Sequence, residues 1–313
     1  MPLRRLHSGN RAAAGACPCR VRAPAAAAPP PPRSSARSIA RAAPGSGDAS
    51  GSDADEPPIV MGDWREFRAK LLAQSGESEW SSRRSDENMR VLRDQNPGLA
   101  AEEVWAHATP APERGGLLIS APDATRLLES ERYWQLVVLV ISHDAGGTVG
   151  LILNRPSGLV MGRKQGGLPF SMAGGPPGLQ EVFADSRVYC GGFLAQQVIH
   201  VLHGHKLAGS MEVVPGVYVG GENEAVARVA GGKLPASDFK FFSGALAWEP
   251  KELEAQMERG AWITAAASRP LVLKQVLQLP KPLWCEVMEL MGGTFAAQAR
   301  AARQQQGEGE SEQ

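Results

Sequence analysis

Long hydrophobic runs are missing from this 313-residue sequence, since no apolar stretch approaches the roughly 20 residues that a membrane-spanning helix needs. The sequence also lacks G-x-S-x-G, the glycine-rich phosphate-binding motifs and H-E-x-x-H. These absences remove the usual sequence support for a membrane protein, a nucleophile elbow, a nucleotide-binding loop and a zinc protease. We therefore assign no catalytic residue and expect neither a metal nor a cofactor.

Cysteine is also scarce, with four residues in the chain. Cys17 and Cys19 lie in a leader that we expect to be removed, which leaves Cys190 and Cys285. Two thiols without a C-x-x-C spacing cannot form a tetrahedral sulfur site. We interpret both as buried, inert thiols; because Cys190 adjoins two glycines, a redox role stays open as the alternative.

Acidic residues are absent from the first 47 positions, which carry eight arginines and no lysine. The rest of the chain has 25 basic and 33 acidic residues, a net charge of −8 that argues against nucleic-acid binding. An acid-free, arginine-rich leader without a continuous apolar core predicts an organelle transit peptide rather than a secretory signal. We expect the plastid (chloroplast stroma), with the mitochondrion as an alternative. A disordered tail that stays attached is the other interpretation.

Composition and pattern divide the chain into five segments. Glycine, serine and aspartate mark a linker, apolar side chains at helical spacing mark an extension, and a polar C-terminus is expected to fray. The segments are a transit peptide (1–47), a flexible linker (48–60), a helical N-terminal extension (61–113), an α+β domain (114–295) and a polar tail (296–313).

The extension is expected to pack on the main domain rather than fold alone. Residues 62–74 have apolar residues at i, i+3, i+7 and i+8, which predicts one stripe of a helix. Residues 97–108 are expected to form a short helix. The apolar residues concerned are Trp64, Phe67, Leu71 and Leu72 in the first helix and Leu99, Val104 and Trp105 in the second.

The main domain is expected to be one compact α+β domain with a mixed, mostly antiparallel curled sheet flanked by short helices. Regular strand–helix alternation, typical of a doubly wound sheet, is absent. The β-branched run at 136–142 is typical of a strand buried on both faces. The expected strands are 115–122, 136–142, 148–156, 188–194, 198–203, 216–221, 239–248 and 261–266, and the expected helices are 222–232, 250–260, 269–279 and 281–291. Residues 123–134 are expected to form a short helix or a turn.

Asn154 and Arg155 are candidate ligand residues because they follow an apolar strand directly. Pro156 comes next and cannot continue the ladder. A polar pair fixed at a strand end can present an amide and a guanidinium to a ligand. The favoured alternative is that Asn154 bonds the local backbone and that Arg155 forms a surface ion pair.

Gly191 and Gly192 are the second candidate position, since glycine permits unusual backbone angles. Close packing of this backbone against a neighbouring strand is favoured over a ligand cradle. In H-V-L-H-G-H, the two-residue strand period places His200 and His203 on opposite faces, whereas His203 and His205 can share one. A structural role for His203 is favoured over metal binding or general-base catalysis.

Two tryptophans flank the expected helix at 250–260. Trp248 precedes it and Trp262 follows it, and both are large apolar side chains that need a buried partner. We therefore expect Trp248 and Trp262 to pack beneath this helix.

The chain resembles the YqgE/AlgH family over about residues 114–295. Four blocks have the family's order and spacing: GGLLISAP, VVLVISHDAGGTVGLILNRP, CGGFLAQQVIHVLH and SGALAWEPKELEAQMERGAWITAAAS. WREFRAKL and LWCEVMELMGG resemble the plant plastid members in particular. The family's motif positions correspond to Asn154-Arg155-Pro156, Gly191-Gly192 with Leu202-His203, and Trp248 with Leu253.

The resemblance also has departures. Phe193 replaces the family's usual proline, and Lys251-Glu252 replaces a pair that commonly contains glutamine. A ligand site that depends on that glutamine amide is therefore in doubt. The resemblance implies a compact α+β fold, but it does not by itself imply a catalysed reaction. Some bacterial members carry the label of transcriptional regulator, but no helix-turn-helix motif or basic patch supports it in this sequence.

These observations favour a non-catalytic plastid binding or regulatory protein with a protein or small-molecule partner that the sequence does not identify. We expect a monomer or weak oligomer, with no nucleic acid and no membrane among its partners. One alternative is a hydrolase-like enzyme that uses Asn154, Arg155 and His203 near a glycine-lined pocket. The other is a transcriptional regulator, by family label only.

Overall fold

The structure, a computed structural model, describes residues 63–74, 86–162, 166–169, 175–277 and 279–311. All of them belong to the unit Pro58–Gln313. The expected transit peptide (1–47) and linker (48–60) lie outside the described residues. Among the helices that are described, none is long and apolar enough to cross a membrane.

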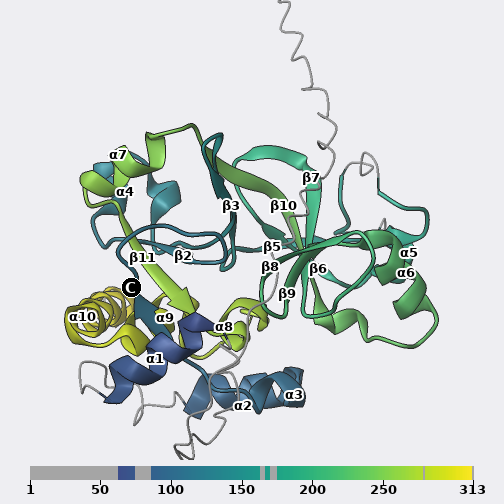
Figure 1. The fold of residues 1–313 in the computed structure, drawn as a ribbon, viewed down its shortest axis with the longest axis horizontal. Coiled ribbons are helices and arrows are strands. Elements are labelled where there is room, and N and C mark those ends of the chain that lie inside the picture. The colour runs from purple at the N-terminus through teal and green to yellow at the C-terminus, as the bar shows by residue number, and fades with distance from the viewer. Residues whose placement is uncertain (1–62, 75–85, 163–165, 170–174, 278, 312–313) are drawn as a thin grey trace, which may run out of the picture. The chain divides into compact units, whose positions relative to one another are not determined.

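Eleven strands in the described part of the chain form one sheet (Figure 1). Its main path runs β1-β11-β2-β3-β4-β10-β7-β9-β8, all antiparallel, and β6 pairs with β10 in parallel and with β5. The strands are β1 (Ala106–Ala108), β2 (Leu117–Ser120), β3 (Val137–Asp144), β4 (Gly147–Ile152), β5 (Pro156–Val160), β6 (Arg187–Cys190), β7 (Leu194–His203), β8 (Ser210–Val214), β9 (Val217–Gly220), β10 (Phe239–Trp248) and β11 (Trp262–Ala267).

Short helices flank this sheet. Helices α5 and α6 lie together at one end, and α9 and α10 lie together at the other (Figure 1). The helices are α1 (Trp64–Gln74), α2 (Asp86–Gln95), α3 (Pro97–Ala100), α4 (Ala124–Leu127), α5 (Leu179–Val182), α6 (Glu222–Ala230), α7 (Glu252–Glu258), α8 (Arg269–Leu273), α9 (Leu283–Met291) and α10 (Gly293–Ser311), with 3-10 turns η2 (Glu131–Tyr133) and η3 (Ala236–Asp238).

Strand β10 joins the two halves of the sheet and bends where they meet. Its first half lies between β6 and β7, and its second half pairs with β4. The register shifts between Ser243 and Ala245, and the intervening Gly244 has φ +71°. A Cβ at Gly244 would lie 2.6 Å from the carbonyl oxygen of Leu194, so glycine is required at this bend. The curled, mostly antiparallel α+β fold is confirmed.

Strand β3 shows why the domain needs helices on both faces of the sheet. Val137 and Leu139 pack with Trp284 of α9 in one core, whereas Val138 and Val140 pack in a second core beside α7. All four β3 side chains are fully buried. Because successive strand residues face opposite sides, an uninterrupted apolar run is stable only between two apolar layers. The expectation of a strand buried on both faces is confirmed.

Several predicted elements have different bounds. Residues 123–134, expected to form a short helix or a turn, form the short helix α4 and the 3-10 turn η2, separated at Glu129, whose φ of +53° no α-helix accommodates. The expected strand at 188–194 ends at Cys190, and β7 starts at Leu194. Strands β5 and β8 were not predicted, because their sequences contain proline, glycine or charged residues and show no clean alternation.

The extension and the tail need larger corrections. Residues 97–108 contain only the short helix α3, and Ala106–Ala108 become the edge strand β1, paired with β11. Helix α1 contacts the domain through Ala69, which is buried with Trp105, while its expected apolar stripe stays largely exposed. The tail expected to fray at 296–313 is helical to Ser311, because its small residues Ala296 and Ala299 are buried where α10 meets α9.

Candidate functional site

Asn154 and Arg155 serve the backbone at the end of β4. Asn154 Oδ1 accepts a hydrogen bond from the Val137 N–H at 3.0 Å, and Asn154 Nδ2 donates to the Gln135 carbonyl at 2.8 Å. Arg155 donates to the carbonyl of Trp134 and lies 5.8 Å from the centre of that indole. Both groups of the Asn154 amide are therefore occupied by main chain. The favoured alternative, local bonding of Asn154 to the backbone, is therefore confirmed. Arg155 bonds a backbone carbonyl instead of forming the expected surface ion pair.

Gly191 and Gly192 lie where two backbone segments come into contact. A Cβ on Gly191 would be 2.4 Å from the Gly244 carbonyl oxygen, and one on Gly192 would be 1.9 Å from the carbonyl carbon of Ala245. No side chain fits in these gaps, because real Cβ contacts essentially never fall below about 3 Å. These glycines therefore permit close packing against β10, the favoured of their two interpretations.

His203 is buried and bonded to the backbone on both sides of its ring. Its Nε2 lies 2.8 Å from the Gly220 carbonyl oxygen, which can only accept, and its Nδ1 accepts from the His205 N–H at 3.3 Å. These contacts define a neutral tautomer, and burial lowers the pKa of His203, which also favours the neutral ring. The ring has no lone pair left for a substrate.

The structure does not bring His203 together with Asn154 and Arg155. Cys190, whose N–H bonds the Arg155 carbonyl, pairs with Ser243 of β10, whereas His203 pairs with Phe239. Four residues of strand separate these two positions, which is about 13 Å. The geometry therefore gives no support to a shared active site for these three residues.

Trp248 packs against helix α7, as the sequence predicts. Trp248 and Trp262 meet edge to face at 5.7 Å beside α7. Their indole N–H groups both donate to Gln256 Oε1, at 3.0 and 2.8 Å. The expected packing of both tryptophans beneath this helix is confirmed, and Trp248 is 5% exposed.

A cleft of about 450 Å³ lies elsewhere, between the extension and the domain. One wall comes from the end of α2, from α3 and from the residues after it. The opposite wall comes from the turn after β7, from η3 and from α8 with the residues that follow. Leucines and paired polar side chains line it together. These segments are distant in sequence, so only the tertiary fold creates this site.

A histidine–aspartate pair stands at one side of the cleft. His205 Nε2 lies 2.8 Å from Asp238 Oδ2, and Asn96 Nδ2 donates to Asp238 Oδ1 at 3.2 Å. Asn96 is held in turn because its Oδ1 caps α3 by accepting from the Leu99 N–H. Within the described residues, His205 Nδ1 has no hydrogen-bond partner. The pair therefore presents one open imidazole nitrogen.

An arginine–glutamate pair stands at the other side. Arg269 of α8 binds both carboxylate oxygens of Glu102 through Nε and Nη2. This hydrogen bonding raises the pKa of Arg269, so its guanidinium stays charged. The guanidinium lies against two glycines, since a Cβ on Gly204 or on Gly216 would be 3.3 Å from Arg269 Nη1. The turn residues thus leave the space that Arg269 occupies.

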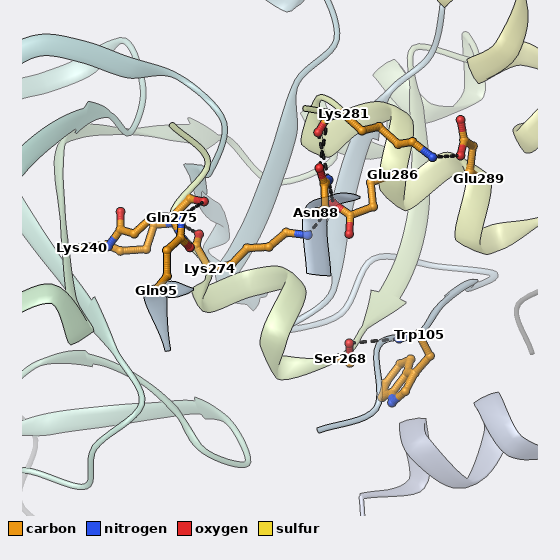
Figure 2. A network of polar contacts seen from close by, with 10 residues as sticks. All are labelled: Asn88, Gln95, Trp105, Lys240, Ser268, Lys274, Gln275, Lys281, Glu286 and Glu289. Carbon is orange, nitrogen blue, oxygen red and sulfur yellow. Dashed lines mark hydrogen bonds and ion pairs between the residues drawn. The ribbon is translucent and has the colours of Figure 1, made fainter. Parts of the chain in front are cut away.

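A buried polar network fixes the extension beneath this cleft (Figure 2). The Lys274 ammonium pairs with Glu286 of α9, and both side chains are almost completely buried. Asn88 Nδ2 of α2 donates to the same carboxylate at 2.6 Å, and Asn88 Oδ1 accepts from the Lys281 N–H at 3.0 Å. Asn88 therefore connects the extension to α9 itself and to the residues just before it.

Two shorter links complete the network (Figure 2). Gln95 and Gln275 exchange two hydrogen bonds, because each Gln95 amide atom bonds the Gln275 backbone. Trp105 and Ser268 also exchange two hydrogen bonds, because the Trp105 N–H donates to the Ser268 hydroxyl oxygen and the Ser268 N–H donates to the Trp105 carbonyl oxygen. Such buried polar links are directional, so they set the position of α2 and α3 as well as their affinity for the domain.

Lys240 of β10 is the unusual member of this region, because it is fully buried without a carboxylate partner among its described contacts. Its Nζ donates to the Lys274 carbonyl at 3.0 Å and lies 5.1 Å from the centre of the Tyr189 ring. Burial, together with the nearby Lys274 ammonium, lowers the pKa of Lys240 to about 7.

Sequence reasoning did not identify this cleft. Its polar residues Asn96, Glu102, His205, Asp238 and Arg269 come from four separate segments and form no motif. The one usable signal was the H-G-H spacing, and the predicted proximity of His203 and His205 is confirmed by their stacked rings, 6.3 Å apart.

The domain is similar in sequence to a known protein family and to several bacterial proteins. A profile of the AlgH-like family matches residues 117–296. A "UPF0301 protein" of Pelodictyon phaeoclathratiforme is 30% identical over 184 residues, covering 58% of this chain and 88% of the relative. A "UPF0301 protein" of Chlamydia muridarum is 31% identical over 192 residues, covering 59% and 90%.

Two solved structures are also similar. The AlgH protein of Pseudomonas aeruginosa has 22% identity and a TM-score of 0.44, covering 60% of this chain and 93% of that one. A protein of Corynebacterium diphtheriae has 21% identity and a TM-score of 0.45, covering 64% and 96%. The matched family region starts after Asn96 and Glu102, so one wall of the cleft lies outside it.

Proposed function

The chain belongs to the AlgH-like family, and we propose that it is a non-catalytic binding or regulatory protein of the plastid stroma whose ligand occupies the cleft beside His205. The observation that carries this proposal is the cleft itself. Its volume of about 450 Å³ falls within the range of small-molecule sites. Its polar side chains are held in place by partners before any ligand arrives, which lowers the entropic cost of binding.

The plastid assignment rests on the leader alone. Eight arginines without one acidic residue over positions 1–47 are typical of an organelle transit peptide. A fusion of residues 1–60 to a fluorescent protein should enter chloroplasts, whereas the same fusion with all eight arginines replaced by alanine should remain in the cytosol. Import into mitochondria would support the alternative compartment, and no import of either fusion would contradict the proposal.

The binding role can be tested by blocking the cleft. Gly98 lines it, and a Cβ there would meet only Asn96 Oδ1, at 3.4 Å, so a larger side chain can be introduced without disturbing the core. Full-length protein is dialysed against a chloroplast metabolite extract, and retained molecules are measured by mass spectrometry. We expect wild type and Gly98→Ala to retain the same molecule and Gly98→Trp to lose it. Equal retention by all three proteins, or no retention by any, would contradict the proposal.

The two alternatives gain nothing from the geometry. A hydrolase built on Asn154, Arg155 and His203 requires convergent side chains, and the structure places His203 about 13 Å along β10 from the other two. A transcriptional regulator would need positive charge for phosphate contacts. The charged side chains of the cleft are instead paired with one another.

A further inference from the structure

Part of the cleft lining is apolar. Leu92, Leu99 and Leu273 line it, and the first two are almost completely buried. Three leucines in a lining that also carries polar side chains favour a ligand with a small apolar body and one polar group. The Cβ position of Gly204 is 3.1 Å from Leu273 Cδ1 and 3.3 Å from Arg269 Nη1, so apolar and polar lining groups lie side by side.

One donor remains for that polar group. Arg269 uses Nε and Nη2 on Glu102, and Nη1 makes no hydrogen bond to the residues that the structure describes. The Cβ position of Gly204, which lines the cleft, is 3.3 Å from Arg269 Nη1, so this nitrogen lies close to the cleft lining.

The charges of the lining favour an anion at this position. The carboxylates of Glu102 and Asp238 already have cationic or amide partners, and Lys274 pairs with Glu286. A new cation would find no unused carboxylate. An anion would find the Arg269 guanidinium, which stays charged.

We propose that the cleft binds a carboxylate attached to a small branched apolar body, with the carboxylate at Arg269 Nη1 and the apolar body against the three leucines. This inference rests on the proposed binding function. Since α2 and α3 supply two of the three leucines and lie outside the family region, the extension is part of the binding site.

Calorimetric titration of the full chain with N-acetyl-leucine, and with its uncharged isostere N-acetyl-leucinamide, tests the ligand class. We expect the carboxylate to bind about tenfold or more tightly than the amide, as a lost hydrogen bond to a charged group predicts. Gly98→Trp should abolish binding, and Gly98→Ala should preserve it. Arg269→Gln/Glu102→Gln, which keeps the pair neutral, should remove the preference for the carboxylate.

A matched control is the exposed pair on α4. Arg126→Gln/Asp123→Asn makes the same charge change far from the lining residues and should leave both titrations unchanged. Two further ligands distinguish the source of the carboxylate. Tighter binding of a tetrapeptide ending in leucine identifies the C-terminus of a polypeptide, whereas equal binding of 4-methylpentanoate identifies a free organic acid.

The outcomes separate this inference from the proposed function. If the acid and the amide bind equally and Gly98→Trp blocks both, the cleft is a binding site but the carboxylate inference is wrong. If neither ligand binds at millimolar concentration, the carboxylate inference is also wrong, while the metabolite experiment still decides the binding role. Binding that survives Gly98→Trp would contradict the location of the site.

Discussion

The bend of β10 and its N-terminal end use polar residues in opposite ways. At the bend, residues of the family motifs are consumed by structure: the Asn154 amide bonds two backbone groups, and Gly192 makes room for Ala245. Beyond the N-terminal end, His205 is held by a partner but keeps one nitrogen open beside a cleft. The motif residues at the bend are those that the close approach of two backbones requires, and they are not those that line the cleft.

The same contrast appears in the burial of charge. The bend of β10 is packed from backbone and apolar side chains, whereas its beginning carries Lys240 and lies near the buried Lys274–Glu286 pair. Buried charges stabilise a fold poorly, because desolvation offsets most of their attraction, but they specify geometry. Here they fix the extension in the position that completes the cleft.

The largest expected effect is at the bend. Gly192→Ala should lower the free energy of unfolding by more than about 4 kcal/mol, or prevent folding, because its Cβ would overlap the Ala245 backbone, which cannot move without breaking the β10 pairing. Urea unfolding measures the change. Gly158→Ala on β5, with nothing within 4 Å of its Cβ position, is the control and should change stability little. Comparable losses in both variants would refute the close-packing role.

The next effect tests the buried charges of the network. Glu286→Gln should cost about 3–5 kcal/mol of unfolding free energy, because it leaves the buried Lys274 ammonium without its counter-charge. Denaturant unfolding measures this loss. Lys274→Met/Glu286→Leu removes both charges and should recover most of it. If the double variant is as unstable as the single one, the pair itself contributes the stability and this account of the network is wrong.

The exposed Glu66–Lys70 pair on α1 is the control for this measurement. Glu66→Gln makes the same chemical change where water surrounds both charges, so its urea midpoint should not move.

Much of the apolar architecture could be predicted from the sequence. A run such as 136–142 specifies a strand with two buried faces because its local pattern and its burial coincide. The prediction that Trp248 and Trp262 pack beneath the helix between them was also correct. The tail could not be predicted in this way, because Ala296 and Ala299 are small, and the burial that orders α10 depends on how close α9 lies.

The cleft could not be predicted for a different reason. Asn96, Glu102, His205, Asp238 and Arg269 are individually ordinary, and their proximity depends on long-range pairings such as β1 with β11. His203 was considered because histidines cluster at 200–205, yet the residue with an open nitrogen is His205, two positions along. The difference lies in the partners that the fold supplies to each ring, which spacing along a strand does not encode.

Lys240 gives a smaller effect with a distinctive pH dependence. Its folded-state pKa of about 7 is below its ordinary value of 10.5, so at pH 7 and below folding must either bury a charge or release a proton. Lys240→Met should raise the unfolding free energy at pH 7 by about 2 kcal/mol, after the loss of its hydrogen bond to Lys274 is subtracted.

The sign of this dependence follows from linkage. Between pH 7 and pH 10.5 the unfolded chain binds more protons at this site than the folded chain, so wild-type stability rises with pH relative to the variant. The advantage of Lys240→Met should therefore shrink as pH increases, as measured by urea unfolding at pH 6, 7, 8 and 9. A difference that is independent of pH would show that Lys240 is not titrating in this range.

The smallest effect separates stability from binding. Asn154→Ala removes two hydrogen bonds to the backbone and should lower the free energy of unfolding by about 1–3 kcal/mol. Because Asn154 lies at the end of β4, away from the cleft, the affinity for N-acetyl-leucine should be unchanged. Urea unfolding and calorimetric titration of the same sample measure both quantities. If Asn154→Ala weakens binding while the protein remains folded, the bend of β10 takes part in ligand recognition, and the division between the bend and the N-terminal end fails.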